Sequence, residues 1–193
     1  MSRCVKVRRK TLETEVEIEL SIDGQGEFKA DMTQEFFKHM LETFAKQGMF
    51  DLEVKAREFS MPDEHHLVED VGLTLGDAFR KALGEKRSVA RYGFFILPMD
   101  DALALVSVDL GGRPFCLLEA SFEREKVGDF STELVYDFFK SFCDSSCSNV
   151  QVILLRGRND HHKIEAIFKA FGRAMRIACK KDAGGIPSTK GVL

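Results

Sequence analysis

One five-residue pattern occurs twice in this chain of 193 residues, and it constrains the fold more than any other feature. His65-His66-Leu67-Val68-Glu69 and His161-His162-Lys163-Ile164-Glu165 both read His-His-x-x-Glu, and the second begins 96 positions after the first. Each motif stands where a helical spacing of apolar residues begins, over about 65–83 in one case and about 161–181 in the other. The matched motifs predict an internal duplication in which each half contributes one such helix.

The remaining periodicity predicts the same order of elements in both halves. For the first half we expect a strand (16–22), a turn, a strand that pairs back on it (27–31), a helix capped by Thr33 and stopped by Gly48, a strand (51–59), a Pro-containing loop (60–64) and a helix (65–83). For the second half we expect a hairpin (94–97 and 103–108), a strand (115–121), a helix capped by Ser131, a strand (150–155) and a helix opened by Asn159-Asp160 (161–181).

This order predicts an α+β protein with an internal duplication of two ferredoxin-like-type βββαβα halves, the ribosomal-protein-S5-domain-2-like arrangement, with sheets packed against helices. No stretch reads as a long linker, so residues 1–193 are expected to form a single domain of two pseudo-repeated halves, about 1–91 and 92–181. A short polar tail, 182–193, follows them.

Composition argues against several classes of partner. With 28 basic and 31 acidic residues and a net charge of -3, the chain has no cationic surplus for nucleic acid or an anionic membrane. No apolar run approaches the roughly 20 residues of a membrane helix, and the first residues lack a signal-peptide core. The five cysteines are odd in number and scattered, which does not fit a disulfide scaffold. We therefore expect a reduced, cytoplasmic protein.

The two motifs favour a metal centre. On a helix, His65 and Glu69 are four residues apart and His66 and Glu69 three apart, so either imidazole can share a face with the carboxylate. Adjacent side chains point about 100° apart, so a His-His pair is better suited to placing one imidazole on each of two ions than to chelating one. Mixed imidazole and carboxylate ligands suit Mn, Fe, Zn or Ni rather than Ca or Mg. A single histidine at a helix start is more often a cap, but caps do not require a glutamate at matched spacing in both motifs.

Further short motifs then resemble a known family over nearly the whole chain, the imidazoleglycerol-phosphate dehydratases of histidine biosynthesis. The matching stretches are Thr11-Leu-Glu-Thr14, Phe36-Phe-Lys-His-Met-Leu41, His65-His-x-x-Glu-Asp70, Arg91-Tyr-Gly93, Pro98-Met-Asp-Asp-Ala-Leu103, Asp109-Leu-Gly-Gly-Arg-Pro114, Glu125-Lys-Val-Gly128, His161-His-x-x-Glu-Ala-x-Phe-Lys169 and Ile186-Pro-Ser-Thr-Lys-Gly191. Each piece is weak alone, but their order and spacing together are specific.

The resemblance implies a hydro-lyase that removes water from imidazole glycerol phosphate to give imidazole acetol phosphate. It also implies two Mn²⁺ ions per active site, which hold the substrate imidazole between them as an imidazolate and stabilise charge pushed into the ring. A large symmetric homo-oligomer of 24 subunits is implied as well, with the metals at subunit contacts, so that removing the metal is expected to dissociate it.

The resemblance also assigns roles to individual positions. Glu13 matches the family's candidate acid/base. The implied metal ligands include all five histidines and are His39, His65, His66, Glu69, His161, His162 and Glu165. The implied phosphate-binding residues are Arg91, Arg113, Lys169, Ser188 and Lys190, a set of guanidinium, ammonium and hydroxyl groups that suits a dianion. The tail that carries the last two is expected to close over the substrate.

Several positions depart from the family pattern. Gln151 stands where a sixth ligand histidine is expected, and an amide oxygen is a poorer Mn ligand than imidazole. Lys38 replaces an acidic residue beside His39, and Thr43 and Gln47 replace a Gln and a His on the phosphate side. Loss of such supporting groups typically costs about 10–100-fold in affinity or activity.

These departures leave three functions open. The first is the active dehydratase. The second is a catalytically weakened or inactive metal-binding homologue that serves in assembly or sequestration, and the third is a dinuclear hydrolase on the same scaffold.

Overall fold

The computed structural model describes residues 3–59, 63–182 and 185–191, so part of the expected 60–64 loop and part of the tail lie outside the described residues. The first half contains β1 (Cys4–Lys10), β2 (Thr14–Ser21), β3 (Phe28–Asp31), α1 (Glu35–Gly48), β4 (Asp51–Glu58) and α2 (His65–Leu83). The second half contains β5 (Tyr92–Met99), β6 (Ala102–Asp109), β7 (Phe115–Glu119), β8 (Lys126–Val127), β9 (Phe130–Ser131), α3 (Leu134–Ser146), β10 (Asn149–Arg156) and α4 (Asp160–Cys179). Apart from the small β8–β9 hairpin, both halves follow the predicted βββαβα order.

The duplication extends to the strand order of the two sheets. One sheet has the order β1-β2-β4-β3 and the other β5-β6-β10-β7, so equivalent strands occupy equivalent places. The expected pairing of 27–31 with the strand before it was wrong, because β3 pairs in parallel with β4, with Phe28 opposite Leu52. The chain before β3 passes the start of β4, where the Asp51 carboxylate accepts hydrogen bonds from the backbone N–H groups of Gln25 and Glu27.

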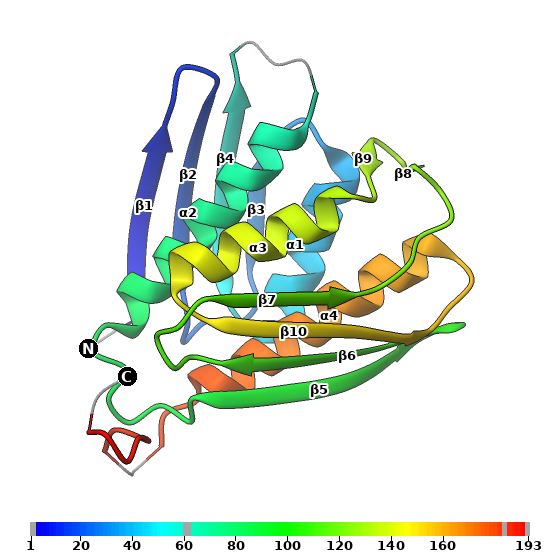
Figure 1. Ribbon diagram of the computed structural model, residues 1–193. Helices are drawn as coiled ribbons and strands as arrows, with labels where there is room; N and C mark the ends of the chain where they lie inside the picture. The colour runs from blue at the N-terminus through cyan, green and yellow to red at the C-terminus, as the bar shows by residue number, and fades with distance from the viewer. Residues whose placement is uncertain (1–2, 60–62, 183–184, 192–193) are drawn as a thin grey trace.

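The four helices lie between the two sheets (Figure 1). The alternating pattern of β2 explains this, because Val16, Ile18 and Leu20 are fully buried while the glutamates between them face outward. Phenylalanine dominates the helical layer, with rings stacked or edge-to-face at centroid distances such as 4.8 Å for Phe44 and Phe171. Within the described residues no helix is long and apolar enough to span a membrane.

Two glycines allow the helices to pack closely in pairs. A Cβ on Gly172 of α4 would lie 2.4 Å from the carbonyl oxygen of Phe44 in α1. A Cβ on Gly76 of α2 would lie 2.6 Å from the carbonyl oxygen of Phe142 in α3. In each pair the two helix backbones are therefore in close contact at the glycine. This contact fixes the distance between the side chains that lie one or two helical turns away on the paired helices.

The helix starts differ in part from the expected caps. Asn159 does cap α4, its side chain accepting a hydrogen bond from the backbone of His161. The expected caps Thr33 and Ser131 were wrong, because α1 follows Gln34 and α3 follows Glu133, neither with a side-chain cap. The start of α1 is instead bound by Asp129, whose carboxylate accepts from the backbone N–H groups of the first two residues at 2.7 and 3.0 Å. A residue more than 90 positions away supplies this cap, so local sequence does not reveal it.

Candidate metal and phosphate sites

Packing of α1 against α4 brings three candidate ligands together. The ligand atoms of His39, His161 and Glu165 all lie within 4.8 Å of one another. Glu165 is the centre of the group, 3.7 Å from Nε2 of His39 and 3.4 Å from Nε2 of His161. Burial is the largest single influence and raises the pKa of Glu165, but the hydrogen bond from Lys169 at 2.8 Å and the positive charges nearby together hold the pKa below its ordinary value. The carboxylate is therefore held in its anionic form, as a cation ligand must be.

The two histidines of the second motif point into different surroundings. The rings of His161 and His162 are 78° apart, with centroids separated by 6.0 Å. His161 faces the cluster with Glu165, whereas Nδ1 of His162 lies 2.6 Å from Oδ1 of Asp101, in the β5–β6 turn. The two imidazoles of this motif therefore have different neighbours, as expected for adjacent side chains on a helix.

The first motif has the same divergent arrangement. The rings of His65 and His66 are 80° apart. Nδ1 of His65 lies 3.8 Å from Oδ2 of Asp137 on α3, and Nδ1 of His66 lies 2.9 Å from Oε2 of Glu13. The His66 contact lacks hydrogen-bond geometry, and within the described chain this buried nitrogen has no hydrogen-bond partner. Glu69, the last residue of the motif, is half-buried on the same helix.

Asp137 is a candidate ligand that the sequence prediction missed. The left-handed residues that end α1 and α3, Met49 and Cys147, align the two helices with an offset of 98 positions. At that offset Asp137 corresponds to His39, and each faces the first histidine of a motif from the neighbouring helix. The available signal was the repeat between the helices, which is obscured because one copy carries an imidazole and the other a carboxylate.

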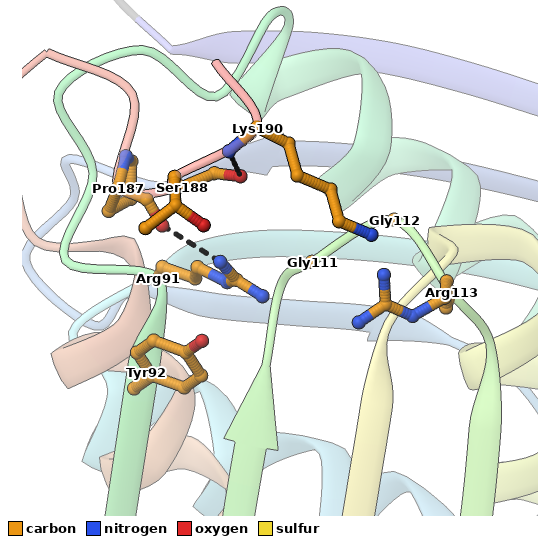
Figure 2. Close-up of a pocket in the computed structure, with 9 residues that line it drawn as sticks. Arg91, Tyr92, Gly111, Gly112, Arg113, Pro187, Ser188 and Lys190 are labelled. Carbon is orange, nitrogen blue, oxygen red and sulfur yellow. Dashed lines mark hydrogen bonds between the residues drawn. The ribbon is translucent and has the colours of Figure 1, made fainter. Parts of the chain in front are cut away.

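A separate pocket of about 770 Å³ gathers most of the expected phosphate-binding residues. Figure 2 shows the side chains of Arg91, Arg113 and Lys190 directed into one space beside Ser188. The Gly111-Gly112 turn also lines it. Two guanidiniums, an ammonium and a hydroxyl on one wall are suited to a phosphate dianion.

Arg91 is fixed from both sides of this pocket. Its Nε and Nη2 donate to the two oxygens of Asp109 at 2.7 and 3.2 Å, and Nη1 donates to the carbonyl of Pro187 at 2.8 Å. The hydrogen bond to Asp109 raises the pKa of Arg91 further. The Pro187 contact ties the tail to the pocket, which brings Ser188 and Lys190 to it.

Lys169 is not among the residues that line this pocket. Its Nζ lies 2.8 Å from Glu165 and 3.4 Å from Sδ of Met99, so within one chain it belongs to the ligand cluster. The structure thus divides the expected site residues among the α1–α4 cluster, the start of α2 and the tail pocket.

Comparison with known proteins decides the family. The family model for imidazoleglycerol-phosphate dehydratase matches residues 11–175. An imidazoleglycerol-phosphate dehydratase of Caldicellulosiruptor bescii is 47% identical over 99% of this chain and 98% of its own length. The chain belongs to the imidazoleglycerol-phosphate dehydratase family.

Other relatives extend this similarity. The histidine biosynthesis bifunctional protein HisB of Spirosoma linguale is 48% identical over the whole of this chain, which covers 50% of that protein. The crystal structure of the dehydratase from Pyrococcus furiosus, in complex with (S)-C348, superposes with a TM-score of 0.85 at 36% identity, covering 96% of this chain and 99% of that one. The expected fold is confirmed.

The positions that depart from the dehydratase family pattern lie in well-defined places. Gln151 is on the outer face of its sheet, since its neighbours Val150 and Val152 are buried beneath the helices, and its amide donates to Asn149 at 3.3 Å. It therefore lies apart from the cluster of its own chain, whereas Asp137 lies beside a motif histidine.

The departures on α1 all have local partners. Lys38 lies 3.3 Å from Glu35. Thr43 is buried and donates to the carbonyl of Met40 at 2.9 Å, and Gln47 accepts from Arg173 at 2.8 Å. These side chains are accommodated in the helix packing and leave His39 and its cluster in place.

Proposed function

We propose that this protein is an imidazoleglycerol-phosphate dehydratase, a hydro-lyase that converts D-erythro-imidazole glycerol phosphate into imidazole acetol phosphate and water in histidine biosynthesis. Membership of the family supports this, and one structural observation carries it. The two histidines of each motif diverge, so that every imidazole faces its own carboxylate or ligand cluster. Such a geometry serves a pair of metal ions better than it serves helix capping.

We infer two Mn²⁺ ions per active site. The chemistry of the donors fits, because the cluster combines imidazoles with a carboxylate held as an anion, and the buried Nδ1 of His66 has no hydrogen-bond partner within the described chain. One centre would draw on His39, His161 and Glu165 and the other on His65, Glu69 and Asp137, with His66 and His162 completing them. When bound, the metals supply positive charge that stabilises electron density in the substrate ring.

The chain's own residues transfer protons and bind the phosphate. Glu13 is the proposed acid/base, because its carboxylate is half-exposed in the β1–β2 turn and reaches the His66 ring. Arg91, Arg113, Ser188 and Lys190 bind the phosphate, with Lys169 approaching from the cluster side. Closure of the tail over this pocket excludes water from the substrate.

We also propose assembly into a symmetric oligomer of 24 cytoplasmic subunits. Within the described residues of one chain, three ligands meet in the cluster and the start of α2 lies outside that group, so a complete centre needs ligands from a second copy. The outer face of the second sheet supports such contacts, because Phe94, Ile96 and Phe115 are exposed there.

The test combines metal analysis, the dehydratase assay and Glu13→Gln on one preparation. We expect two Mn²⁺ per active site, turnover of imidazole glycerol phosphate, and a loss of about 10²–10⁴-fold in kcat for Glu13→Gln with unchanged metal content. Glu15→Gln, two positions away on the outer face of the same hairpin, is the matched control and should retain activity.

Other outcomes would contradict the proposal. Metal binding without turnover at saturating Mn²⁺ would identify an inactive homologue, and hydrolysis of generic phosphoesters would identify a dinuclear hydrolase. Full activity of Glu13→Gln would remove Glu13 from proton transfer.

A further inference from the structure

The two hairpin turns that enter the central strands carry carboxylates at equivalent positions. Glu13 immediately precedes β2 and Asp101 immediately precedes β6, the strand in the same place of the second sheet. Each carboxylate faces Nδ1 of the second histidine in a motif, at 2.9 Å for Glu13 and His66 and 2.6 Å for Asp101 and His162. The duplication therefore places a carboxylate beside an imidazole in both halves.

The two carboxylates differ in how firmly they are held. The second oxygen of Asp101 accepts hydrogen bonds from the backbone N–H groups of Arg158 and Asn159, at 2.5 and 3.0 Å. Asp101 is thus fixed between the hairpin turn and the loop that leads into α4. Glu13 has a longer side chain and is 49% exposed, against 31% for Asp101.

Both oxygens of Asp101 are placed as acceptors. One accepts from the two backbone N–H groups, and the other lies 2.6 Å from Nδ1 of His162. Because an ionised carboxylate only accepts hydrogen bonds, the proton of this contact belongs to Nδ1 of His162. The opposite nitrogen, Nε2, is 3.5 Å from Asp100, beyond the usual N–H···O range.

We propose that Asp101 is a positioning residue that holds His162 in the Nδ1–H tautomer, with the Nε2 lone pair free for a metal ion. The proposal rests on the metal role of His162 stated above, although its first readout does not. A carboxylate that accepts the second N–H of a ligand imidazole fixes the ring orientation and increases its basicity. The duplicated position has then diverged into an anchored carboxylate that orients a ligand, Asp101, and a freer one that is available for proton transfer, Glu13.

Asp101→Asn separates this role from simple support of the loop. The asparagine oxygen can still accept from the backbone of Arg158 and Asn159, but its NH₂ group then faces Nδ1 of His162 as a donor. Nδ1 must therefore become an acceptor, which moves the proton to Nε2, the nitrogen proposed to bind metal.

The matched control is Asp129→Asn. Asp129 also accepts two backbone N–H groups, those at the start of α1, but it has no imidazole among its hydrogen-bond partners in the described chain. Both variants remove one negative charge and keep a backbone acceptor, so any difference between them reports the contact with His162.

The first measurement is the ring ¹⁵N spectrum of metal-free protein, assigned to His162 by comparison with His162→Gln. We expect the Nδ1–H tautomer in the unsubstituted protein and in Asp129→Asn, and the Nε2–H tautomer in Asp101→Asn. The second is Mn²⁺ titration, in which Asp101→Asn should lose about 10–100-fold in affinity at one of the two centres. Asp101→Glu should recover part of this affinity.

Two results would overturn the proposal. One is an Nε2–H tautomer of His162 in the unsubstituted protein, and the other is equal Mn²⁺ affinity of Asp101→Asn and Asp129→Asn. If the tautomer changes as expected while the unsubstituted protein binds no Mn²⁺, the metal role of the proposed function fails instead. Unfolding curves for both variants show that each remains folded.

Discussion

Equivalent residues in the two halves have kept their places and changed their chemistry. His39 and Asp137 occupy the same position on α1 and α3, and each lies beside the first histidine of a motif. One half therefore offers an imidazole where the other offers a carboxylate. Asp137 makes its proposed metal centre more negative than the centre that contains His39. A more anionic ligand set binds a hard divalent cation such as Mn²⁺ more tightly and favours it over softer metals.

The buried Lys86 allows a test of how the phosphate pocket is held. Its Nζ donates to the carbonyl of Leu110 at 2.8 Å, next to the Gly111-Gly112 turn, and burial lowers its pKa below the ordinary 10.5. Between the lowered value and 10.5 the unfolded chain holds more protons than the folded one, so stability rises with pH in this window. We expect the free energy of unfolding of the unsubstituted protein, relative to Lys86→Met, to increase as the pH rises towards 10.5, as measured in urea.

Lys140→Met is the control for this pH dependence, because its expected slope has the opposite sign. The hydrogen bond with Asp144 raises the pKa of Lys140, so its contribution is present at lower pH and is lost as pH rises through the folded value. A difference between the unsubstituted protein and Lys86→Met that is constant across this range would contradict the role of burial.

At the scale of elements, the helix pairs are built by the same contact in each half. Gly172 meets Phe44 and Gly48 in α1, and Gly76 meets Phe142 and Ser146 in α3. Alanine at either position has no room beside a backbone carbonyl, so the helices of that pair must separate. Since the candidate ligands are shared between paired helices, this contact also sets their spacing.

We predict that Gly172→Ala and Gly76→Ala each destabilise the protein by about 1–3 kcal/mol in urea unfolding, as overpacked cores do. Their effects on metal binding should differ. Gly172→Ala should weaken the centre that uses His39 and Glu165, and Gly76→Ala the centre that uses Asp137, as read by two-site Mn²⁺ titration. Equal loss at both centres in each variant would show that the spacing is not set pair by pair.

The elements also show how far sequence alone can go. Helix 65–83 was predicted with its observed bounds, because its apolar spacing and the following Gly84 are local signals. The parallel pairing of β3 with β4 and the capping of α1 by Asp129 depend on contacts between distant residues, which periodicity does not contain. The ligand role of His39 was expected from family resemblance, whereas Asp137 emerged only when the packed helices aligned the repeats. Gln151 stands where the family resemblance implies a sixth ligand histidine, and the sequence alone did not show that the register of β10 places it on the outer face of the sheet.

At the scale of the molecule, the two sheets share a topology and present different outer surfaces. In the first sheet the row Arg8, Glu17 and Lys55 crosses the outer face, with ion pairs such as Lys6–Glu17 at 2.7 Å. The equivalent row of the second sheet is Ile96, Leu105 and Ile153. Charges keep an exposed sheet face soluble, whereas an apolar face of this kind marks a surface that another protein covers.

We therefore predict that Ile96→Lys disrupts self-association. The lysine would carry an unpaired charge into the centre of an apolar contact, a cost of several kcal/mol per interface that is repeated at every symmetric copy. Light scattering after size exclusion should show a smaller particle for Ile96→Lys than for the unsubstituted protein. Ser21→Lys, which adds the same charge to the outer face of the first sheet, should leave the particle mass unchanged. If metal ligands are shared between copies, chelation of Mn²⁺ should also reduce the mass of the unsubstituted protein and add little to the effect of Ile96→Lys. An unchanged mass for Ile96→Lys together with a reduced mass for Ser21→Lys would place the contact on the charged sheet instead.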